Sequence, residues 1–499
     1  MKLSKSKKFY ITTTLPYVNA DPHVGFATEA IRADVIARHK KIEGFEVFFN
    51  TGTDEHGQKL YEAAKKAGKD VKKYVDEYAE RFRGLKDLLG LSEDIHFIRT
   101  TDPHHIKAAQ EFWKRVESAG YIYPKNYKSK YCVGCEESKT DSELVDGCCP
   151  VHPNMKIELI DEENYFFEFS AFGDRLLKFY DDENNSNFII PNSRMKEMRE
   201  FIGKKGETKL EDFSISRLKE KMPWGIPIPS HDNHVMYVWF DALVNYISTL
   251  GWPEDVENFE AYWKNGTPTQ YCGKDNTRFQ SVMWQAMLMA ADLPPSAKII
   301  VDGFITGEGG VKMSKSLGNV INPYDIVKEY GPDALRYFVT RELSSFEDSP
   351  FFVARFKEAY NAGLANGLGN LVSRVMKMAV SYGVKYDASE FSVDEDGLPL
   401  NDKFVVGYKD SLAKYNLQGA MNAIWLGIMN WDLIIQQKEP FKKIKTNPEE
   451  AKNDIKFLLF DLMQISIMLK PFMPATSEKI SKAVLNNEEI KVPLFPRIP

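Results

Sequence analysis

The fold of this chain is decided by residues 9–57, which have the sequence FYITTTLPYVNADPHVGFATEAIRADVIARHKKIEGFEVFFNTGTDEHG. Residues Phe9–Leu15 are rich in threonine and β-branched side chains, which is typical of a strand. The turn-forming stretch Asn19–Pro22 follows, and apolar side chains then recur at helical spacing to about Glu43. A short apolar strand, Glu46–Asn50, completes a predicted β–α–β unit.

Polar residues stand at both strand ends of this unit, where open α/β sheets bind ligands. The second strand runs into Thr51–Gly57, and the first is followed by Pro22–Phe26 at a predicted helix start. A helix N-terminus offers unpaired backbone N–H groups and a positive dipole end to a phosphate. His23 would add a donor, and Gly25 would let an adenine ring approach the backbone. So short a motif also fits a purely structural role.

A second motif, Lys312-Met313-Ser314-Lys315-Ser316, follows the glycine-rich stretch Gly303–Gly310. Two lysines beside hydroxyl groups suit a polyphosphate whose charge must be neutralised while a bond to the α-phosphorus breaks. A solvated surface loop would have a similar composition. The glycines favour a loop that can close over a ligand and reopen.

Four of the five cysteines are clustered within eighteen residues, which indicates metal binding and not disulfides in a chain without a leader. Cys132 and Cys135 form one pair, and Cys149 and His152 form another with the same two-residue gap. Three thiolates and one imidazole suit tetrahedral Zn²⁺ with no open position, so the site is predicted to be structural. Cys148 is an alternative ligand, but only Cys149 keeps the gap to His152.

The length of 499 residues predicts about three domains, and 43% hydrophobic with 27% charged residues is an ordinary globular composition. Between Tyr121 and about Pro191 the sequence is rich in Cys, Gly, Pro and aromatic residues, which indicates an inserted subdomain. Strand signals nearly vanish after Phe351, and the helices expected there are broken near Gly383–Asn401 and at Pro440. The predicted division is 1–120 and 191–300 for two halves of an α/β nucleotide-binding domain, 121–190 for a zinc-bearing insertion, 301–350 for a connecting region, and 351–499 for an all-helical domain.

Bulk charge and hydropathy exclude some classes of function. The net charge of −6 disfavours a small basic nucleic-acid-binding protein, and no DNA partner is expected, although a large acidic body can carry a local basic strip. No apolar run approaches the roughly 18–20 residues that span a bilayer. Met1–Lys8 lacks an apolar core and arginine, so no leader is expected. The expected location is the cytoplasm, without a membrane partner.

The two phosphate-type motifs, about 290 residues apart, together resemble the HIGH and KMSKS signatures of class I aminoacyl-tRNA synthetases. The resemblance covers essentially the whole chain. Further segments are similar to the methionine branch of that family: Leu15–Ala20, Thr51–Gly57, Tyr237–Ala242, Gly273–Asp275 and Gly331–Arg336.

The resemblance implies a class I nucleotide-binding (Rossmann-like) α/β domain with a zinc-knuckle insertion, followed by an all-α anticodon-binding domain. It implies an enzyme that ligates methionine to tRNA through methionyl-adenylate, with ATP and Mg²⁺ as substrate and cofactor. By this resemblance His23, Lys312 and Lys315 are the catalytic residues. The ATP-binding residues are His23, Gly25, Gly273, Asp275, Lys312, Ser314 and Lys315.

Methionine offers only a flexible thioether, so its recognition requires a closely fitted apolar wall. The resemblance places Leu15, Tyr17, Trp239, Ala242, Tyr246, Phe279, Gln280 and Trp284 around the side chain, and Asp54 at the ammonium group. Plain core packing is the alternative for the aromatic positions, and for Ala242 and Phe279 in particular.

Single-stranded RNA bases are recognised by stacking on aromatic rings and by hydrogen bonds to their edges. Asn370 and Arg374 are four residues apart on one predicted helix face. Phe441 follows Pro440 and precedes a group of lysines. These three residues, Asn370, Arg374 and Phe441, are expected to bind the anticodon. Without the family resemblance, Phe441 fits a core position.

Three residues depart from the family pattern. Phe26 stands where the second histidine of the first signature is expected, Gln280 stands where a histidine is common, and Phe441 replaces a tryptophan. Loss of one preorganised donor typically costs about 2.7–4 kcal/mol, which leaves open a non-catalytic tRNA-binding protein. Because His23 and both signature lysines remain, the sequence favours an active enzyme.

Other members of the class fit less well. The zinc of a cysteinyl-tRNA synthetase binds the thiolate of the substrate, whereas the predicted knuckle already has four protein ligands. Valine, isoleucine and leucine enzymes carry a large editing insertion, and the roughly 70 residues of 121–191 are too few. No appended dimerisation domain precedes the end at Pro499, so a monomer is expected.

Overall fold

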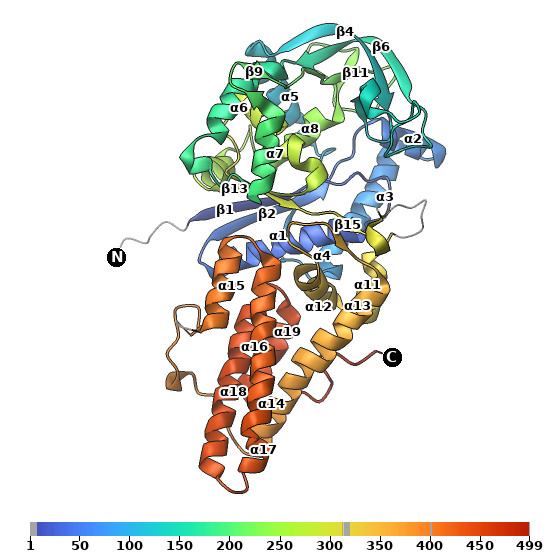
Figure 1. Cartoon of the computed structure of the whole chain (residues 1–499). Coiled ribbons are helices and arrows are strands. Elements are labelled where there is room, and N and C mark those ends of the chain that lie inside the picture. The colour runs from blue at the N-terminus through green and yellow to red at the C-terminus, as the bar shows by residue number, and fades with distance from the viewer. Residues whose placement is uncertain (1–6, 312, 314–319, 400–401, 499) are drawn as a thin grey trace. The chain divides into compact units, whose positions relative to one another are not determined.

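The computed structural model describes residues 7–311, 313, 320–399 and 402–498 (Figure 1). These residues belong to two compact units, each described here by itself. The first unit comprises 1–22, 45–84 and 94–301, and the second comprises 23–44, 85–93 and 302–499. The five-part division expected from the sequence stays a prediction.

The first unit is built on a six-stranded sheet with the order β3-β2-β1-β13-β14-β7. Strands β3, β2, β1 and β13 are parallel neighbours, and so are β14 and β7. The polar segments that follow β1, β2 and β13 therefore leave the sheet at one edge. The strands are β1 (Lys8–Thr13), β2 (Glu46–Thr53), β3 (His96–Arg99), β7 (Ile189–Ile190), β13 (Thr267–Gly273) and β14 (Lys298–Asp302).

Helices α6, α7 and α8 lie to one side of strands β1, β2 and β13 in Figure 1. Helix α5 contributes Phe112 and Trp113 to the core of the first unit, where they pack against Phe240 and Trp284. The helices of this unit are α2 (Gln58–Lys66), α3 (Val71–Arg83), α5 (Pro103–Ser118), α6 (Gly173–Tyr180), α7 (Asn192–Ile202), α8 (Val238–Leu243), α9 (Asn245–Ser248) and α10 (Trp284–Ala290), with π-helical turns at Phe259–Lys264 and Phe279–Met283.

An antiparallel sheet with the order β10-β6-β4-β5 carries the cysteine-rich insertion. Its long hairpin pairs Ile122 with Phe167 at one end and Tyr131 with Glu158 at the other, so that β4 delivers Cys132 at its tip. The strands are β4 (Ile122–Cys132), β5 (Glu137–Lys139), β6 (Glu158–Phe167) and β10 (Phe213–Ser214), and two short pairs are β8 (Gly203–Lys204) with β9 (Glu207–Thr208) and β11 (Ser216–Leu218) with β12 (His234–Met236).

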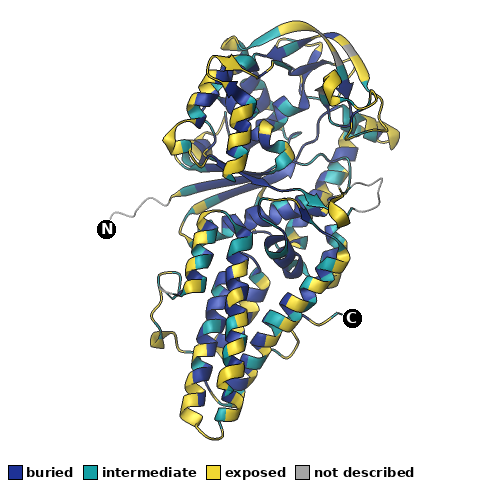
Figure 2. Ribbon diagram, viewed as in Figure 1, coloured by how far each residue is buried: buried dark blue, intermediate teal, exposed yellow. Residues whose placement is uncertain are grey.

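The second unit is mainly helical, and its described residues after Phe351 form only helices and turns, as the sequence predicts. The expected breaks occur between α14 and α15 and at Pro440. Buried and exposed faces alternate around these helices (Figure 2). The elements are α1 (Val24–Ile42), α4 (Leu85–Leu88), α11 (Pro323–Tyr330), α12 (Pro332–Tyr337), α13 (Val353–Ala359), α14 (Asn370–Ser381), α15 (Lys403–Ala413), α16 (Leu417–Lys438), α17 (Pro440–Lys443), α18 (Pro448–Leu469) and α19 (Pro474–Asn486), π-helical Phe338–Glu342 and Tyr360–Gly369, and the strand pair β15 (Ile305–Thr306) and β16 (Ser349–Pro350).

A buried ion pair fastens α1 to α12 inside the second unit. Arg336 Nη2 donates to Asp34 Oδ2 at 2.7 Å, and both side chains are fully buried. Asp34 Oδ1 accepts from the backbone N–H of Ser92 at 2.8 Å, and Arg38 donates to Asp34 Oδ2 from the same helix. The motif that contains Arg336 thus has a structural role in this unit. Within the described residues, no helix is both long and apolar enough to cross a membrane.

Candidate active site and metal centre

The segments that leave β1 and β2 stay paired beyond the sheet. Tyr17 and Asp54 form a parallel bridge, in which the Asp54 N–H donates to the Pro16 carbonyl oxygen at 3.0 Å. Leu15 is buried next to them, and Tyr17 is partly exposed. Three of the residues expected at methionine are therefore brought together by the common edge of two parallel strands.

Three buried carboxyl groups gather near this edge: Asp54, Glu136 and Asp241. Burial raises the pKa of Asp54 well above its ordinary value, and the charges of Asp241 and Glu136 raise it further. Asp54 Oδ1 has no hydrogen-bond partner among the described residues. Burial also raises the pKa of Asp241, against the opposing effect of His56, whose Nδ1 lies 3.3 Å from Asp241 Oδ2. A dry, acidic site with an unpaired oxygen favours a bound cation.

The side chains of Tyr17 and Glu136 lie close enough for each to shift the pKa of the other. Burial raises the pKa of Tyr17, and the neighbouring charges of Glu136 and Asp54 raise it further. Burial raises the pKa of Glu136, while the backbone N–H of Lys59 and the Tyr17 hydroxyl act in the opposite direction. The Lys59 ammonium lies 5.6 Å from the centre of the Tyr17 ring. The Tyr17 ring therefore lies beside a positive charge.

An aromatic pair lies in the same unit. Trp239 stacks on Phe279 with ring centres 3.8 Å apart and planes inclined by 19°. Both rings remain partly exposed, so Phe279 is not a plain core residue. Ala242 lies three residues after Trp239 on α8, on the same helix face, and is also partly exposed. Ala242 therefore adds little side-chain volume to the helix face that carries Trp239.

Tyr246 and Trp284 are buried more deeply. Their rings meet edge to face at 5.9 Å, and Trp284 stacks on Phe112 of the core. Both residues have relative exposures of 2% or less. Trp284 thus belongs to the core cluster, and its expected contact with methionine, like that of Tyr246, stays a prediction.

Gln280 forms part of a buried amide network. Its Nε2 donates to Thr14 Oγ1 at 3.0 Å, and its Oε1 accepts from Gln270 Nε2 at 3.3 Å. Gln270 in turn accepts a hydrogen bond from Ser296, which is also bonded to Gln285. A neutral glutamine at this position is therefore held by donors and acceptors matched to an amide.

Replacing Gln280 by leucine is expected to lower the melting temperature of the protein. The change removes the acceptor for Gln270 Nε2 and the donor to Thr14 Oγ1, which costs about 1–3 kcal/mol, or several °C in a unit of this size. Calorimetry of the variant against wild type measures the shift. Gln58→Leu, at a surface glutamine, is the control. Equal melting temperatures for wild type and Gln280→Leu would contradict the expectation.

The residues expected at ATP in this unit follow β13. Gly273 ends the strand, and Asp275 is exposed in the 3₁₀ turn that comes next. A Cβ added to Gly273 would lie 2.9 Å from Asp275 Oδ1. The glycine therefore lets the carboxylate fold back over the strand end, at the edge where α/β sheets bind ligands.

His23 caps the N-terminus of α1 in the second unit. Its Nδ1 accepts a hydrogen bond from the Gly25 N–H at 3.1 Å, so the neutral ring carries its proton on Nε2. A Cβ at Gly25 would lie 2.9 Å from His23 Cε1, which explains the glycine. The ring is exposed, and its Nε2–H is suited to a phosphate oxygen. Phe26, at the first departure from the family pattern, is buried and packs as an apolar helix residue.

The segment that follows the lysine motif returns to α1. The Val24 N–H donates to the Ile321 carbonyl oxygen at 3.0 Å, five residues after Ser316. Lys312, Ser314 and Lys315 lie outside the described residues, so their roles stay predictions.

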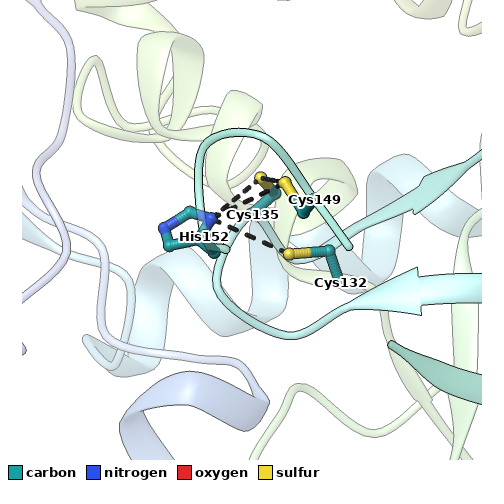
Figure 3. Close-up of side chains that lie close together, drawn as sticks. All are labelled: Cys132, Cys135, Cys149 and His152. Atoms are coloured by element: carbon teal, nitrogen blue, oxygen red, sulfur yellow. Dashed lines mark hydrogen bonds between the residues drawn. The ribbon is translucent and has the colours of Figure 1, made fainter. Parts of the chain in front are cut away.

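The predicted metal ligands converge at one point (Figure 3). The ligand atoms of Cys132, Cys135, Cys149 and His152 all lie within 4.8 Å of one another. His152 Nδ1 lies 3.7, 3.3 and 4.0 Å from the sulfurs of Cys132, Cys135 and Cys149, and the last two sulfurs are 3.6 Å apart. Cys148 is not part of the described cluster.

These spacings fit a tetrahedral ion. With bonds of about 2.3 Å to sulfur and about 2.0–2.1 Å to nitrogen, tetrahedral Zn²⁺ sets its ligand atoms about 3.6–3.8 Å apart. Gly134 lets the loop close, because a Cβ there would lie 2.6 Å from the His152 ring. The residues therefore form a site for a metal ion with four protein ligands.

Known proteins resemble the chain over nearly its whole length. The family model described as tRNA synthetases class I (M) matches residues 9–158 and 151–376. The methionine--tRNA ligases of Caldanaerobacter subterraneus subsp. tengcongensis and Thermotoga maritima are 38% and 37% identical to it. Each match covers 97% of this chain and 75% or 76% of the relative. A solved structure of Mycobacterium tuberculosis methionyl-tRNA synthetase in complex with methionyl-adenylate aligns with a TM-score of 0.85 at 34% identity, covering 98% of this chain and 97% of that one.

The chain belongs to the class I methionyl-tRNA synthetase family. The fold class expected from the sequence is thereby confirmed: an α/β core with a parallel sheet, a cysteine knuckle and a helical C-terminal region. Membership also excludes the cysteine, valine, isoleucine and leucine enzymes as alternatives.

In this synthetase, two of the three residues expected at the anticodon lie on α14. Asn370 is exposed, and Arg374 is partly exposed and forms an ion pair with Asp432 of α16. Phe441 lies in α17, where its ring is 40% exposed, and the Lys442 ammonium lies 5.9 Å from the ring centre. Phe441 is thus no core residue, contrary to the alternative that its apolar character left open.

Three further residues lie near those expected to bind methionine: Glu136, His56 and Asp241. The sequence patterns assigned no role to any of them. Asp241 and His56 stand within motifs that resemble the family, but neither spacing nor residue type pointed to their pairing. The signal for Glu136 was a carboxylate directly after a predicted metal ligand.

Proposed function

We propose that this chain catalyses the ATP-dependent ligation of L-methionine to its tRNA through methionyl-adenylate, with release of AMP and pyrophosphate. The observation that carries the proposal is the buried, partly unpaired Asp54 carboxyl, in the same unit as the partly exposed Trp239–Phe279 stack. An amino acid with a positive ammonium group and a slender apolar side chain matches both features. Family membership supports the same substrates.

The first half-reaction needs no covalent catalyst. One oxygen of the methionine carboxylate attacks the α-phosphorus of ATP in line, and the bond to pyrophosphate breaks. Orientation and stabilisation of charge supply the rate enhancement. The exposed Nε2–H of His23 donates to a phosphate oxygen, and Lys312 and Lys315 neutralise the leaving pyrophosphate. Mg²⁺ bound with ATP supplies further neutralisation.

The second half-reaction transfers the methionyl group. A ribose hydroxyl of the terminal adenosine of tRNA attacks the adenylate carbonyl carbon, and AMP leaves with the bonding electrons. The hydroxyl proton leaves with the departing phosphate or passes to solvent. Asn370, Arg374 and Phe441 bind the anticodon during this step.

Methionine-dependent exchange of labelled pyrophosphate into ATP, without tRNA, tests the adenylation step. Exchange is expected with methionine and Mg²⁺, and not with cysteine, leucine, isoleucine or valine. Because Phe26 is buried in α1, its presence at the histidine position is expected to leave exchange intact. A folded, metal-loaded protein without exchange but with tRNA binding would instead establish the non-catalytic alternative.

We propose that the metal is structural Zn²⁺, held by Cys132, Cys135, Cys149 and His152. Elemental analysis of the purified protein is expected to find one zinc per chain. Cys149→Ser should lose the metal, whereas Cys148→Ser, at the neighbouring cysteine outside the cluster, should keep it. Full metal content in Cys149→Ser would refute this ligand set.

Phe441→Ala is expected to weaken tRNA binding without affecting adenylation. A base that stacks on an aromatic ring gains about 1–3 kcal/mol, so the KM for tRNA should rise roughly 5- to 150-fold. Aminoacylation kinetics measure this rise, and pyrophosphate exchange in the same preparation is the control. Phe457→Ala, at another exposed phenylalanine of the second unit, serves as the matched variant. An unchanged KM for tRNA would remove Phe441 from the binding surface.

A further inference from the structure

Glu136 lies between the metal centre and the residues that are expected to bind methionine. It is the residue directly after the ligand Cys135, and its side chain is buried with a relative exposure of 1%. Its backbone has a φ of +52°, which is unfavourable for a residue with a side chain. The Glu136 backbone is hydrogen-bonded on both sides. Its N–H donates to the Val133 carbonyl oxygen at 3.2 Å, and its carbonyl oxygen accepts from the Tyr237 hydroxyl.

The Glu136 carboxylate contacts the segment that follows β2. Its Oε1 accepts from the backbone N–H of Lys59 at 2.8 Å, at the start of α2. Gly57 makes room for it, because a Cβ there would lie 2.6 Å from the same oxygen. The Lys59 ammonium lies 5.6 Å from the centre of the Tyr17 ring, so the residue that Glu136 holds is also in contact with Tyr17.

The knuckle is tied to the same segment a second time. The Lys59 ammonium donates to the carbonyl oxygen of Gly134 at 3.1 Å, within the loop between Cys132 and Cys135. The chain that leaves β2 after Asp54 is therefore fixed by two residues of the metal-binding loop, Gly134 and Glu136, which flank the ligand Cys135.

We infer that Glu136 is a positioning residue that couples the metal centre to methionine binding by holding the Lys59 backbone, and with it the Lys59 ammonium beside the Tyr17 ring. This inference rests on the proposed function and adds a residue to it. Coordination of Cys135 would fix the backbone that precedes Glu136 and maintain its left-handed conformation. The carboxylate then holds the start of α2, where the Lys59 ammonium lies against the Tyr17 ring. Loss of the metal would loosen these contacts, beginning at Cys135.

Glu136→Gln tests the inference, because it keeps the shape of the side chain and an acceptor for the Lys59 N–H but removes the charge. The Kd for methionine, measured by tryptophan fluorescence without ATP, and the KM in pyrophosphate exchange are expected to rise about tenfold, the loss typical of a charged hydrogen bond. The kcat should change by less than threefold, because Glu136 does not touch the reacting atoms. Zinc content should stay at one per chain.

Glu137→Gln is the matched control, since Glu137 is the next residue and is 41% exposed in an ion pair with Lys139. It should leave the KM for methionine and the zinc content unchanged. An unchanged KM in a zinc-loaded Glu136→Gln variant overturns the inference, while exchange by wild type in the same assay shows that the proposed function stands. Absence of exchange in wild type overturns the proposed function instead.

Lys59→Met supplies a second measurement that does not depend on the folding of a Glu136 variant. Chelation of the metal from the wild-type protein is expected to raise the Kd for methionine. The same treatment should have a clearly smaller effect on Lys59→Met, which lacks the ammonium that joins the Gly134 carbonyl oxygen to the Tyr17 ring. A purely structural metal would raise the Kd by the same factor in both proteins, and that result overturns the inference.

Discussion

Replacing Asp54 by asparagine is expected to lower kcat/KM for methionine in pyrophosphate exchange by about 100- to 1,000-fold. The substitution keeps the size of the side chain and removes its charge. In a buried site, loss of one partner of a hydrogen-bonded charge pair costs about 2–5 kcal/mol, because the other charge loses its compensation. By the proposed function, the group left without compensation would be the ammonium of methionine, at a side chain that is only 5% exposed.

The control for this variant is Asp232→Asn, at an exposed aspartate of the same unit, which should retain wild-type kinetics. Circular dichroism and zinc content verify that Asp54→Asn is folded. A kcat/KM within threefold of wild type would show that the ammonium binds elsewhere.

The affinity of wild type for methionine should also depend on pH. Burial and the nearby carboxyl groups Asp241 and Glu136 raise the pKa of Asp54 well above its ordinary value. An ammonium ligand prefers the ionised carboxylate, so binding releases a proton and weakens as pH falls below that raised pKa. Measured in buffers from neutral to mildly acidic pH, the Kd for methionine should rise on acidification. Asp54→Asn should lose most of this dependence.

Asp34→Asn is expected to have the largest effect on stability. It leaves the fully buried Arg336 guanidinium without its counter-charge, and breaking a buried ion pair in this way costs about 3–5 kcal/mol. In a unit of about 200 residues, that loss corresponds to a fall in melting temperature on the order of 10 °C. Calorimetry measures the fall, and Asp410→Asn, at an exposed position of the second unit, should show none.

The contacts of Asp34 also determine whether the stability of the protein rises or falls with pH. Burial by itself would raise the pKa of Asp34, but Arg336, Arg38 and Ser92 lower it below its ordinary value of 3.8. The pair therefore contributes its full stability above that value and loses it as pH falls through the lowered pKa of the folded state. Between pH 5 and 3, wild type should approach the melting temperature of Asp34→Asn only at the acidic end. If the melting temperatures of wild type and Asp34→Asn differed by the same amount at every pH in this range, the lowered pKa of Asp34 would be contradicted.

The sequence predicted the elements whose signals are local. β-branched runs and helical spacing in residues 9–57 were sufficient for β1, α1 and β2, and the breaks near Gly383 and at Pro440 separate helices as expected. The metal ligands were also predictable, because two pairs with equal gaps encode a knuckle in a short segment. The stretch from Gly331 to Arg336 resembled the family, yet its contribution to a buried ion pair depends on Asp34, about 300 residues away.

The sequence by itself determined the family, the first β–α–β unit and the candidate ligands of the metal centre, since each rests on residues close together in the chain or on motifs with fixed letters. Only the tertiary structure decided which side chains share an environment. It buried Trp284 in the core, left Phe441 exposed, and placed Glu136 beside Lys59 and Asp241 beside His56. Burial and pKa depend on neighbours contributed by distant segments, and no local pattern of residues encodes them.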